Sequence, residues 1–311
     1  MAAIRTQVYL DDEKWVEIPL PVPVDDIVVH HYTSASGLIG ILASNSLWAS
    51  SPVALNDLSE VEYGIEVLHR VWESIQSEKK LSSEQITIVN STLSPEHLRL
   101  SIGRVYFVCA SEASDSLNQW QSYGAPPGYA LGIQTGHDLS VMVPSALASF
   151  TEWTSTGTHM RSGWYRVIYA QAEQDAAARA VLNFVLDHPL LWQRPDLLGN
   201  YVAPIIPQMK NPAFSAEHEV RYIAQSLVEI PEEFRAGPFG VVPYISIAAG
   251  EDHHSFVVED TRGRLPIVSL TCGPVGDGEK VLVNLAAVRL LAKHGYTDAV
   301  VKSSEVPYRV R

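Results

Sequence analysis

The chain has 311 residues, of which 46% are hydrophobic and 18% charged, and its formal net charge is −13 at pH 7. This composition excludes whole-chain disorder, and no apolar run approaches the roughly 20 residues of a transmembrane helix. The acidic balance disfavours a protein that binds nucleic acid over its whole surface, although it is compatible with one basic cleft.

Cysteine usage and the N-terminal residues indicate the compartment. Cys109 and Cys272 are too few for a disulfide scaffold and fit a reducing cytoplasm. Residues 11–13 are acidic, where a signal peptide would need an apolar run. We therefore expect a cytoplasmic protein that does not interact with a membrane.

The first predicted elements surround a short helix. Residues 1–26 are predicted to be an extended lead-in because three prolines interrupt them near their end. Residues 27–31 are rich in β-branched side chains and predict a strand. Thr33 or Ser34 can cap the helix that follows, and Asn45 is a suitable stop for it.

The clearest helix is predicted over 57–78, where apolar residues recur at spacings of three and four. Asp57 and Glu60 fit its capping box, which we favour over a chemical role for the polar run from Asn56. Further strands are predicted over 105–110, 129–134, 164–170, 219–224, 241–247 and 298–302, and further helices over 171–187 and 279–293.

The order of these elements predicts the fold class. Five prolines from 189 to 212 predict a loop-rich connection there. Strands and helices are mixed without regular βαβ alternation, which favours an α+β fold. We expect a single α+β domain over 27–311.

A first polar cluster comprises His30, His31, Tyr32, Thr33 and Ser34, at the end of a predicted strand and the start of a helix. An imidazole and a hydroxyl there can bind one polar ligand, and the helix N-terminus favours an anion such as a diphosphate. The alternative is a capping hydroxyl beside histidines that pack in the core. The sequence does not separate the two histidines, because a one-residue register slip exchanges them.

A second polar cluster follows Lys210. Glu217 and Glu219 stand two apart at the start of a predicted strand, so they are expected on the same face as Arg221. A carboxylate near an arginine stays ionised and can accept a hydrogen bond from a sugar hydroxyl. The alternative is an exposed edge strand of mixed charges.

The remaining motifs are weaker indications of a functional site. Trp120 and Tyr123 can wall a ring-binding pocket by stacking, or they can be core aromatics. Residues 252–254 (Asp-His-His) lack the further ligands of a metal site and are predicted to be a loop, and residues 273–278 are predicted to be a turn. Serine hydrolase, zincin and zinc-ribbon motifs are absent from the sequence, and we expect no metal cofactor.

Taken in order, short segments from residue 28 to 310 resemble a bacterial family known as domain of unknown function 2971. The matching segments are His31 to Thr33, Leu47 to Ser50, Asn56 to Glu60, Ser114 to Trp120, Tyr123-Gly124, Gly128 to Gly132, Lys210 and Phe214 with Glu217, Glu219, Val220 and Arg221, Gly273-Pro274, and Ser303-Ser304 ahead of Pro307 to Arg309.

A looser resemblance is to the ADP-ribosyltransferase superfamily, whose motif plan has three parts. His31-x-Thr33 is similar to the first part, and Glu219 at the start of a late strand is similar to the third. Ser111, Tyr123 and Tyr129 are all candidates for the middle part. This resemblance implies a mixed, mainly antiparallel split sheet flanked by helices.

The resemblance also implies an activity, in which NAD is consumed as a substrate. Glu219 would stabilise the oxocarbenium-like ribose, and Glu217 would orient the acceptor nucleophile. The implied binding residues are His31, Tyr32, Thr33, Ser111, Trp120, Tyr123, Tyr129, Lys210 and Arg221. The ADP-ribose would pass to a macromolecular acceptor or to water. Such proteins are often toxins or defence effectors, which implies a neutralising protein partner.

Two other functions compete with this hypothesis. One is a module without enzymatic activity that binds a nucleotide or a protein in the same cleft. The other is a metal-dependent phosphodiesterase, which would require His30, His31, Asp57 and Glu60 to converge.

Overall fold

The computed structural model describes most of the chain. The described residues are 7–10, 14–17, 19, 21, 23–52, 58–124, 127–147, 160–193, 195–226, 230–237, 240–250 and 256–307. Side chains of β1 and β2 are outside this description.

A mixed sheet of twelve strands runs through the molecule, and a separate antiparallel pair precedes it. The pair is β1 (Gln7–Leu10) with β2 (Lys14–Glu17). The twelve strands are β3 (Val28–Ser34), β4 (Leu47–Ser50), β5 (Val105–Ser111), β6 (Gly128–Gln134), β7 (Leu139–Val143), β8 (Met160–Arg166), β9 (Glu219–Ser226), β10 (Glu233–Gly237), β11 (Gly240–Ala249), β12 (Phe256–Val258), β13 (Ile267–Cys272) and β14 (Val300–Ser303). Only the pairs β7–β12 and β13–β14 are parallel among the described pairings.

Strand β5 is the junction of this sheet. Along one edge it pairs with β9 over its whole length, from Val105 opposite Gln225 to Ser111 opposite Glu219. Its other edge is shared, because β4 pairs with it at Phe107 and β3 pairs with it further along, where His30 lies opposite Ser111. The two groups β4-β11-β7-β12 and β3-β6-β13-β14 therefore diverge from one strand.

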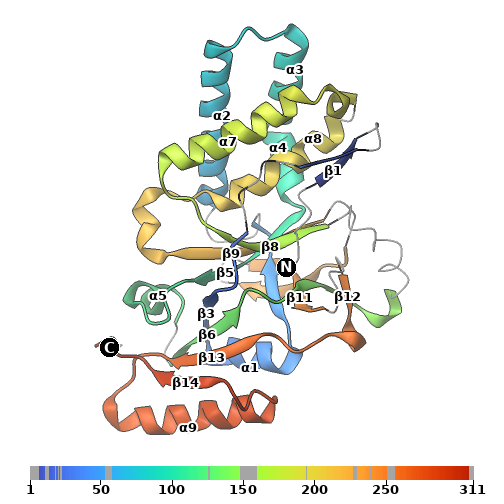
Figure 1. Cartoon of the computed structure of the whole chain (residues 1–311). Coiled ribbons are helices and arrows are strands. Elements are labelled where there is room, and N and C mark those ends of the chain that lie inside the picture. The colour runs from blue at the N-terminus through green and yellow to red at the C-terminus, as the bar shows by residue number, and fades with distance from the viewer. Residues whose placement is uncertain are drawn as a thin grey trace.

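The helices lie on both sides of the sheet (Figure 1). Helices α2 (Leu58–Glu78), α3 (Ser83–Thr92), α4 (Pro95–Ile102), α7 (Gln171–Asp187) and α8 (Pro195–Val202) gather in one lobe above β5, β8 and β9. Helices α1 (Ala35–Ser44) and α9 (Asp277–Lys293) lie toward the opposite end, and α5 (Leu117–Ser122) lies beside β3. The short 3-10 helices are η2 (Ser145–Leu147), η3 (Pro189–Gln193), η4 (Ala203–Gln208), η5 (Pro212–Glu217) and η6 (Glu259–Thr261).

Alternation along β5 and β9 divides the interior into two cores. Phe107 and Ile223 pack with the helical lobe, while Val108 and Tyr222 pack with the residues between the diverging strands and α1 and α9. Successive side chains of a strand point to opposite faces, so both faces of these strands are buried. None of the helices in the described part is long and apolar enough to cross a membrane.

The predicted α+β class and most of the predicted elements are confirmed. Helix α7 has the predicted bounds, Ser34 is the N-cap of α1, and Asn45 ends α1 in the left-handed conformation with φ 49°. Strand β8 lies earlier than the predicted 164–170.

Two predictions about irregular segments are wrong in part. The lead-in contains the pair β1–β2, which the prolines at 19–23 do not reach. The predicted loop-rich connection over 189–212 consists mainly of short helices, because a proline suits the first turn of a helix as well as a loop. Pro195 begins α8 and Pro212 begins η5.

Candidate functional site

Five charged side chains form one ion-pair network, here called the ionic cluster: Glu60, Lys210, Glu217, Glu219 and Arg221. Lys210 Nζ lies 3.0 Å from Glu60 Oε1, 2.7 Å from Glu217 Oε2 and 3.0 Å from Glu219 Oε2. Arg221 Nε donates to Glu219 Oε1 at 2.7 Å, and its Nη2 donates to Glu60 Oε2 at 2.6 Å. The Arg221 guanidinium also lies 4.7 Å from the centre of the Phe107 ring.

Several elements bring these side chains together. Glu219 and Arg221 lie two apart on β9 and share a face, as predicted, whereas Glu60 comes from the first turn of α2. Lys210 follows η4, where Gln174 of α7 donates hydrogen bonds to the carbonyls of Ile168 and Lys210. The cluster therefore forms where the helical lobe meets the sheet.

Two expectations about this cluster are corrected. Glu217 is the last residue of η5 and not part of the strand, because His218 interrupts the backbone with a left-handed conformation at φ 45°. Lys210 nevertheless bonds both Glu217 and Glu219. Strand β9 is not an exposed edge, since it lies between β5 and β8.

Glu60, which we expected to serve only in a helix cap, belongs to the ionic cluster. Its carboxylate binds Lys210 and Arg221, which are 150 and more residues away in the chain. Asp57, the other half of the expected capping box, lies outside the described residues, as do residues 252–254. Only the fold shows that Glu60 belongs to the site.

The charge of the ionic cluster is unbalanced, with three carboxylates for two cations. The two cations are buried, with 3% of the Lys210 side chain and 2% of the Arg221 side chain exposed. The accessible part consists of carboxylates, since Glu60 is 22% and Glu217 14% exposed. The cluster thus presents negative charge outward and suits a cationic group.

The Glu219 carboxylate is held in its ionised form. Burial would raise the pKa of this group, but Arg221 and Lys210 outweigh burial and lower the pKa to about 2. The carboxylates of Glu219, Glu217 and Glu60 raise the pKa of Lys210 above its ordinary value, against the effects of burial and of Arg221. Both groups are therefore charged at neutral pH.

Cys109 and Tyr123 stand beside the cluster and are exposed. Cys109 lies opposite Arg221 in the β5–β9 register, and its thiol is hydrogen-bonded to Glu219. Desolvation of the thiolate by the surrounding protein, and then the Glu219 carboxylate, raise the pKa of this thiol. Burial and the nearby Glu217 carboxylate raise the pKa of the Tyr123 hydroxyl. Sequence reasoning singled out Tyr123 but missed Cys109, which no local motif marks.

The two histidines have different surroundings. His30 lies opposite Ser111, is buried, and has a buried Nδ1 without a hydrogen-bond partner among the described residues. Burial and then the Lys302 charge lower the pKa of His30 to about 4. His31 is only partly buried, its Nδ1 lies 2.8 Å from the carbonyl oxygen of Cys109, and burial lowers its pKa. His31 is therefore the histidine tied to the strand that carries Cys109.

Most of the remaining predicted residues support the structure around the cluster. Ser111 is fully buried, and its hydroxyl donates to the carbonyl of Glu217 at 2.6 Å. Tyr32 donates to the carbonyl of Ala113 at 2.8 Å. Trp120 is buried and packs edge-on against Tyr32 with ring centres 4.6 Å apart, which is the core alternative. Tyr129 is buried in the second core, opposite Thr33.

The convergence that a metal-dependent phosphodiesterase would require is not seen among the described members of that set, His30, His31 and Glu60. Glu60 bonds Lys210 and Arg221 and neither histidine. In the described parts of the chain, no group of three or more His, Cys, Asp and Glu side chains is placed to hold a metal ion.

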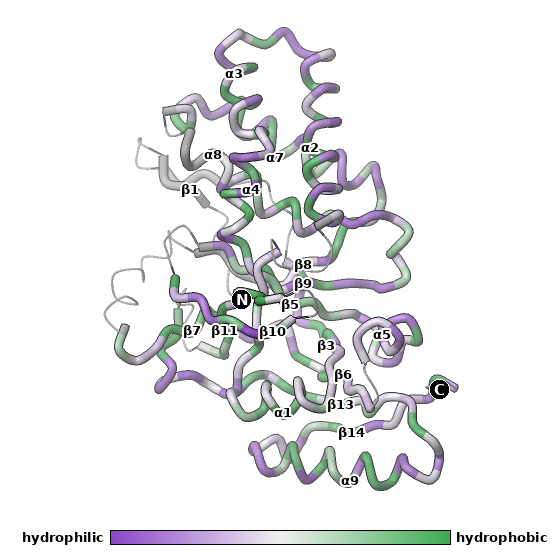
Figure 2. Tube along the Cα trace, turned by 180° about the vertical axis from the view of Figure 1, so that it is seen from behind, coloured by the Kyte–Doolittle hydropathy of each residue, from purple (hydrophilic) through white to green (hydrophobic). Residues whose placement is uncertain are grey.

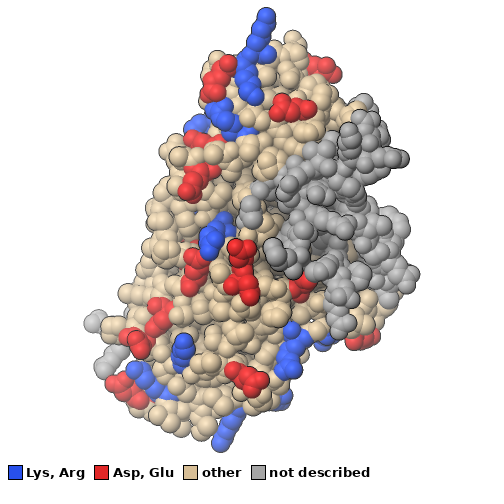
Figure 3. Space-filling model, in the orientation of Figure 1, with Lys and Arg blue, Asp and Glu red and all other residues tan. Residues whose placement is uncertain are grey.

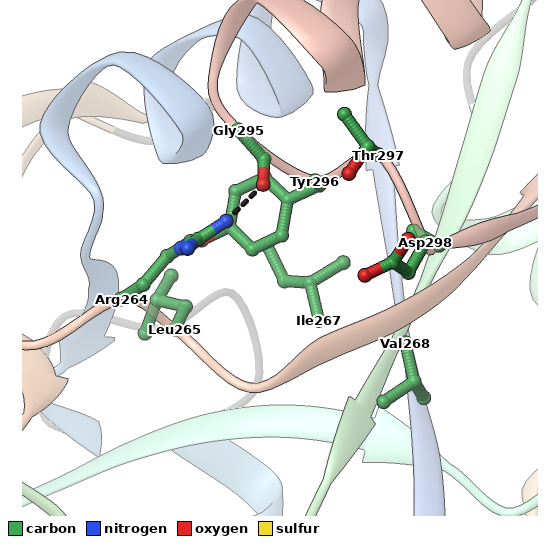
Figure 4. A pocket seen from close by; sticks show the side chains of 9 residues that line it. Arg264, Leu265, Ile267, Val268, Gly295, Tyr296, Thr297 and Asp298 are labelled. Carbon is green, nitrogen blue, oxygen red and sulfur yellow. Dashed lines mark hydrogen bonds between the residues drawn. The ribbon is translucent and has the colours of Figure 1, made fainter.

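Figures 3 and 4 show two further features of the described surface. On the face in Figure 3, basic and acidic side chains are interspersed over the described residues. A cavity of about 370 Å³ lies between the start of β13 and the loop after α9, lined by Arg264, Tyr296 and Asp298 among others (Figure 4). None of its lining residues belongs to the ionic cluster.

Comparison of the chain with protein-family models, with curated proteins and with solved structures finds no match.

Proposed function

We propose that the protein is an enzyme that consumes NAD by cleaving the bond between nicotinamide and ribose, and that ADP-ribose passes to a macromolecule or to water. The observation that carries the proposal is the ionic cluster, which holds an ionised Glu219 beside exposed Cys109 and Tyr123 and has one excess negative charge. The nicotinamide ring of NAD is cationic, so its charge is complementary to the cluster.

The chemistry needs a carboxylate that acts while positive charge develops. When the glycosidic C–N bond breaks, its electron pair leaves with nicotinamide and the ribose becomes oxocarbenium-like. An ionised Glu219 near the ribose stabilises this charge more strongly in the transition state than in the ground state. Glu217, which is more accessible than Glu219, would orient the acceptor hydroxyl or water.

The strand arrangement supports the same proposal. Strands β3, β5 and β9 are neighbours, with His30, Ser111 and Glu219 in one register row. We propose that His31 and Thr33 of β3 contact the substrate and that exposed Tyr123 stacks on nicotinamide. Ser111, Tyr32, Trp120 and Tyr129 would hold the backbone around the site. The two strand groups that diverge from β5 are in keeping with a split, ADP-ribosyltransferase-like sheet.

The test is nicotinamide release from NAD by the purified protein and by Glu219→Gln. We expect release to fall by about 100-fold or more, because a transition-state charge loses its partner. The fold should survive, since Lys210 and Arg221 would still face the carboxylates of Glu60 and Glu217. Glu112→Gln is the matched control, as Glu112 is an exposed carboxylate just after β5 that pairs with Arg166.

Equal release from wild type and Glu219→Gln would contradict the proposal. A second candidate function is a binding module without turnover, which is favoured by one observation: both oxygens of Glu219 already accept hydrogen bonds from Arg221 and Lys210. NAD binding by calorimetry without nicotinamide release would support that function instead.

A further inference from the structure

Helix α9 has apolar side chains on two opposite faces. Its inner face includes Ala287 and Leu291, which are buried in the second core. Its outer face, defined here by Val281, Leu282, Leu285 and Val288, is exposed at 73%, 69%, 45% and 48%. A surface helix of a monomer ordinarily carries polar residues on its outer face.

The outer face is a continuous stripe. Its residues follow at spacings of three and four, and exposed Gly278 and Ala292 extend the stripe at both ends. Figure 2 shows hydrophobic residues recurring along α9, at the end of the molecule away from α2 and α3. This pattern is the one by which a helix packs against another helix.

The two ends of α9 carry opposite net charge. Asp277, Glu279 and Lys280 lie at its start, where Lys280 pairs with Asp277, and Arg289 and Lys293 lie near its end. If a second α9 packs against the outer face in the antiparallel direction, the acidic first turn of each helix lies against the basic last turn of the other. Parallel packing would place like charges together. The helix dipoles also favour the antiparallel direction.

We propose that the outer face of α9 is the interface of a homodimer, in which two copies of this helix pack antiparallel across a twofold axis near Leu285. Leu285 is the middle residue of α9, so the axis brings it against its own copy and places Gly278 opposite Ala292 of the other copy. A twofold axis makes the apolar face complementary to itself, as in the commonest oligomers.

The size of this surface sets the strength of the association. Helix α9 has 17 residues and is about 25 Å long. One helix face of that length buries less than the roughly 800 Å² per partner of a standard interface. The dimer is therefore expected to dissociate on dilution, in the micromolar range.

Sedimentation equilibrium of the full chain at concentrations from about 1 to 100 μM tests the interface. The mass should rise with concentration from 34.2 kDa toward twice that value. Leu285→Lys should weaken association at least about tenfold. Leu100→Lys is the control, because Leu100 on α4 is 72% exposed and lies outside the stripe. A wild type that stays monomeric, or association that Leu285→Lys leaves unchanged, would overturn the proposal.

Cross-linking tests the direction of the helices. In a Cys109→Ser background, Gly278→Cys and Ala292→Cys proteins are oxidised separately and as a mixture. Antiparallel packing predicts a disulfide-linked dimer mainly in the mixture. Dimers that form equally well from each variant alone would contradict the antiparallel arrangement. Circular dichroism of each variant confirms that α9 is retained.

Discussion

Lys210 is the one residue in the described part of the chain that pairs with all three carboxylates of the ionic cluster. Its ammonium bonds Glu60, Glu217 and Glu219, and its side chain is almost completely buried. Removing a carboxylate leaves each cation with a partner, whereas removing this cation leaves Arg221 alone against three negative charges. The cluster is therefore asymmetric in its response to substitution.

Lys210→Met should destabilise the protein by about 3–5 kcal/mol, because it leaves buried carboxylate charge uncompensated. Glu219→Gln should cost about 1–2 kcal/mol, since the amide oxygen can still accept from Arg221. Urea unfolding followed by circular dichroism measures both. Equal losses of unfolding free energy in the two variants would show that the excess negative charge does not control stability here.

His30 makes stability depend on pH. The pKa of His30 is about 4 in the folded protein, where burial and Lys302 lower it from 6.5. Between these values the unfolded chain binds a proton that the folded protein does not, so the free energy of unfolding falls as the pH decreases from 6.5 to 4. The carboxylate of Glu219 contributes mainly at lower pH, because folding lowers its pKa from 4.5 to about 2.

In His30→Leu, the free energy of unfolding should fall less between pH 6.5 and pH 4, by up to about 3 kcal/mol. Thermal unfolding of both proteins at pH 7, 5.5 and 4 provides the comparison, and the difference between them removes the contribution of the other histidines. A pH dependence that is the same in the variant would mean that His30 is not the buried neutral group.

Asn45 connects elements as well as ending one. Its left-handed conformation terminates α1, as its position in the sequence predicts. Its amide nitrogen donates to the carbonyl of Gly263 at 2.7 Å, and its amide oxygen accepts from Leu265 N and from the Tyr296 hydroxyl. These hydrogen bonds link the end of α1 to the segment before β13 and to the loop after α9.

Asn45→Gly keeps the backbone conformation but loses these three hydrogen bonds, so we expect a loss of about 2–3 kcal/mol. Asn45→Ala should cost about 1 kcal/mol more, because alanine resists the left-handed region. Thermal unfolding of the two variants and the wild type separates the two contributions. A glycine variant as stable as the wild type would show that the side-chain bonds add nothing.

At the scale of the whole molecule, the ionic cluster lies where the helical lobe ends against the sheet. Strands β5 and β9 carry apolar residues toward the helical lobe as far as Phe107 and Ile223, and then carry Cys109 and Arg221 on the same face. The lobe covers the apolar part and supplies Glu60 from α2. The change from apolar to charged residues along these two strands positions the site at the edge of the lobe.

Local patterns in the sequence determined much of the fold. Apolar periodicity predicted α2 and α7, a capping serine and Asn45 predicted the ends of α1, and β-branched runs predicted the central strands. Alternation along β9 also predicted that Glu219 and Arg221 share a face. These features depend on neighbours in the chain, and such neighbours interact through a few backbone geometries.

Only the tertiary structure decided the composition of the site and the pairing of the strands. Glu60 looked like a helix cap, Cys109 carried no motif, and Glu217 reaches Lys210 from a 3-10 helix after a left-handed residue. The register that aligns His30, Ser111 and Glu219 joins segments about 80 and 110 residues apart. Contacts at such separations depend on how whole faces pack, because the same charged side chain is satisfied equally well by solvent, by a helix end or by a distant partner.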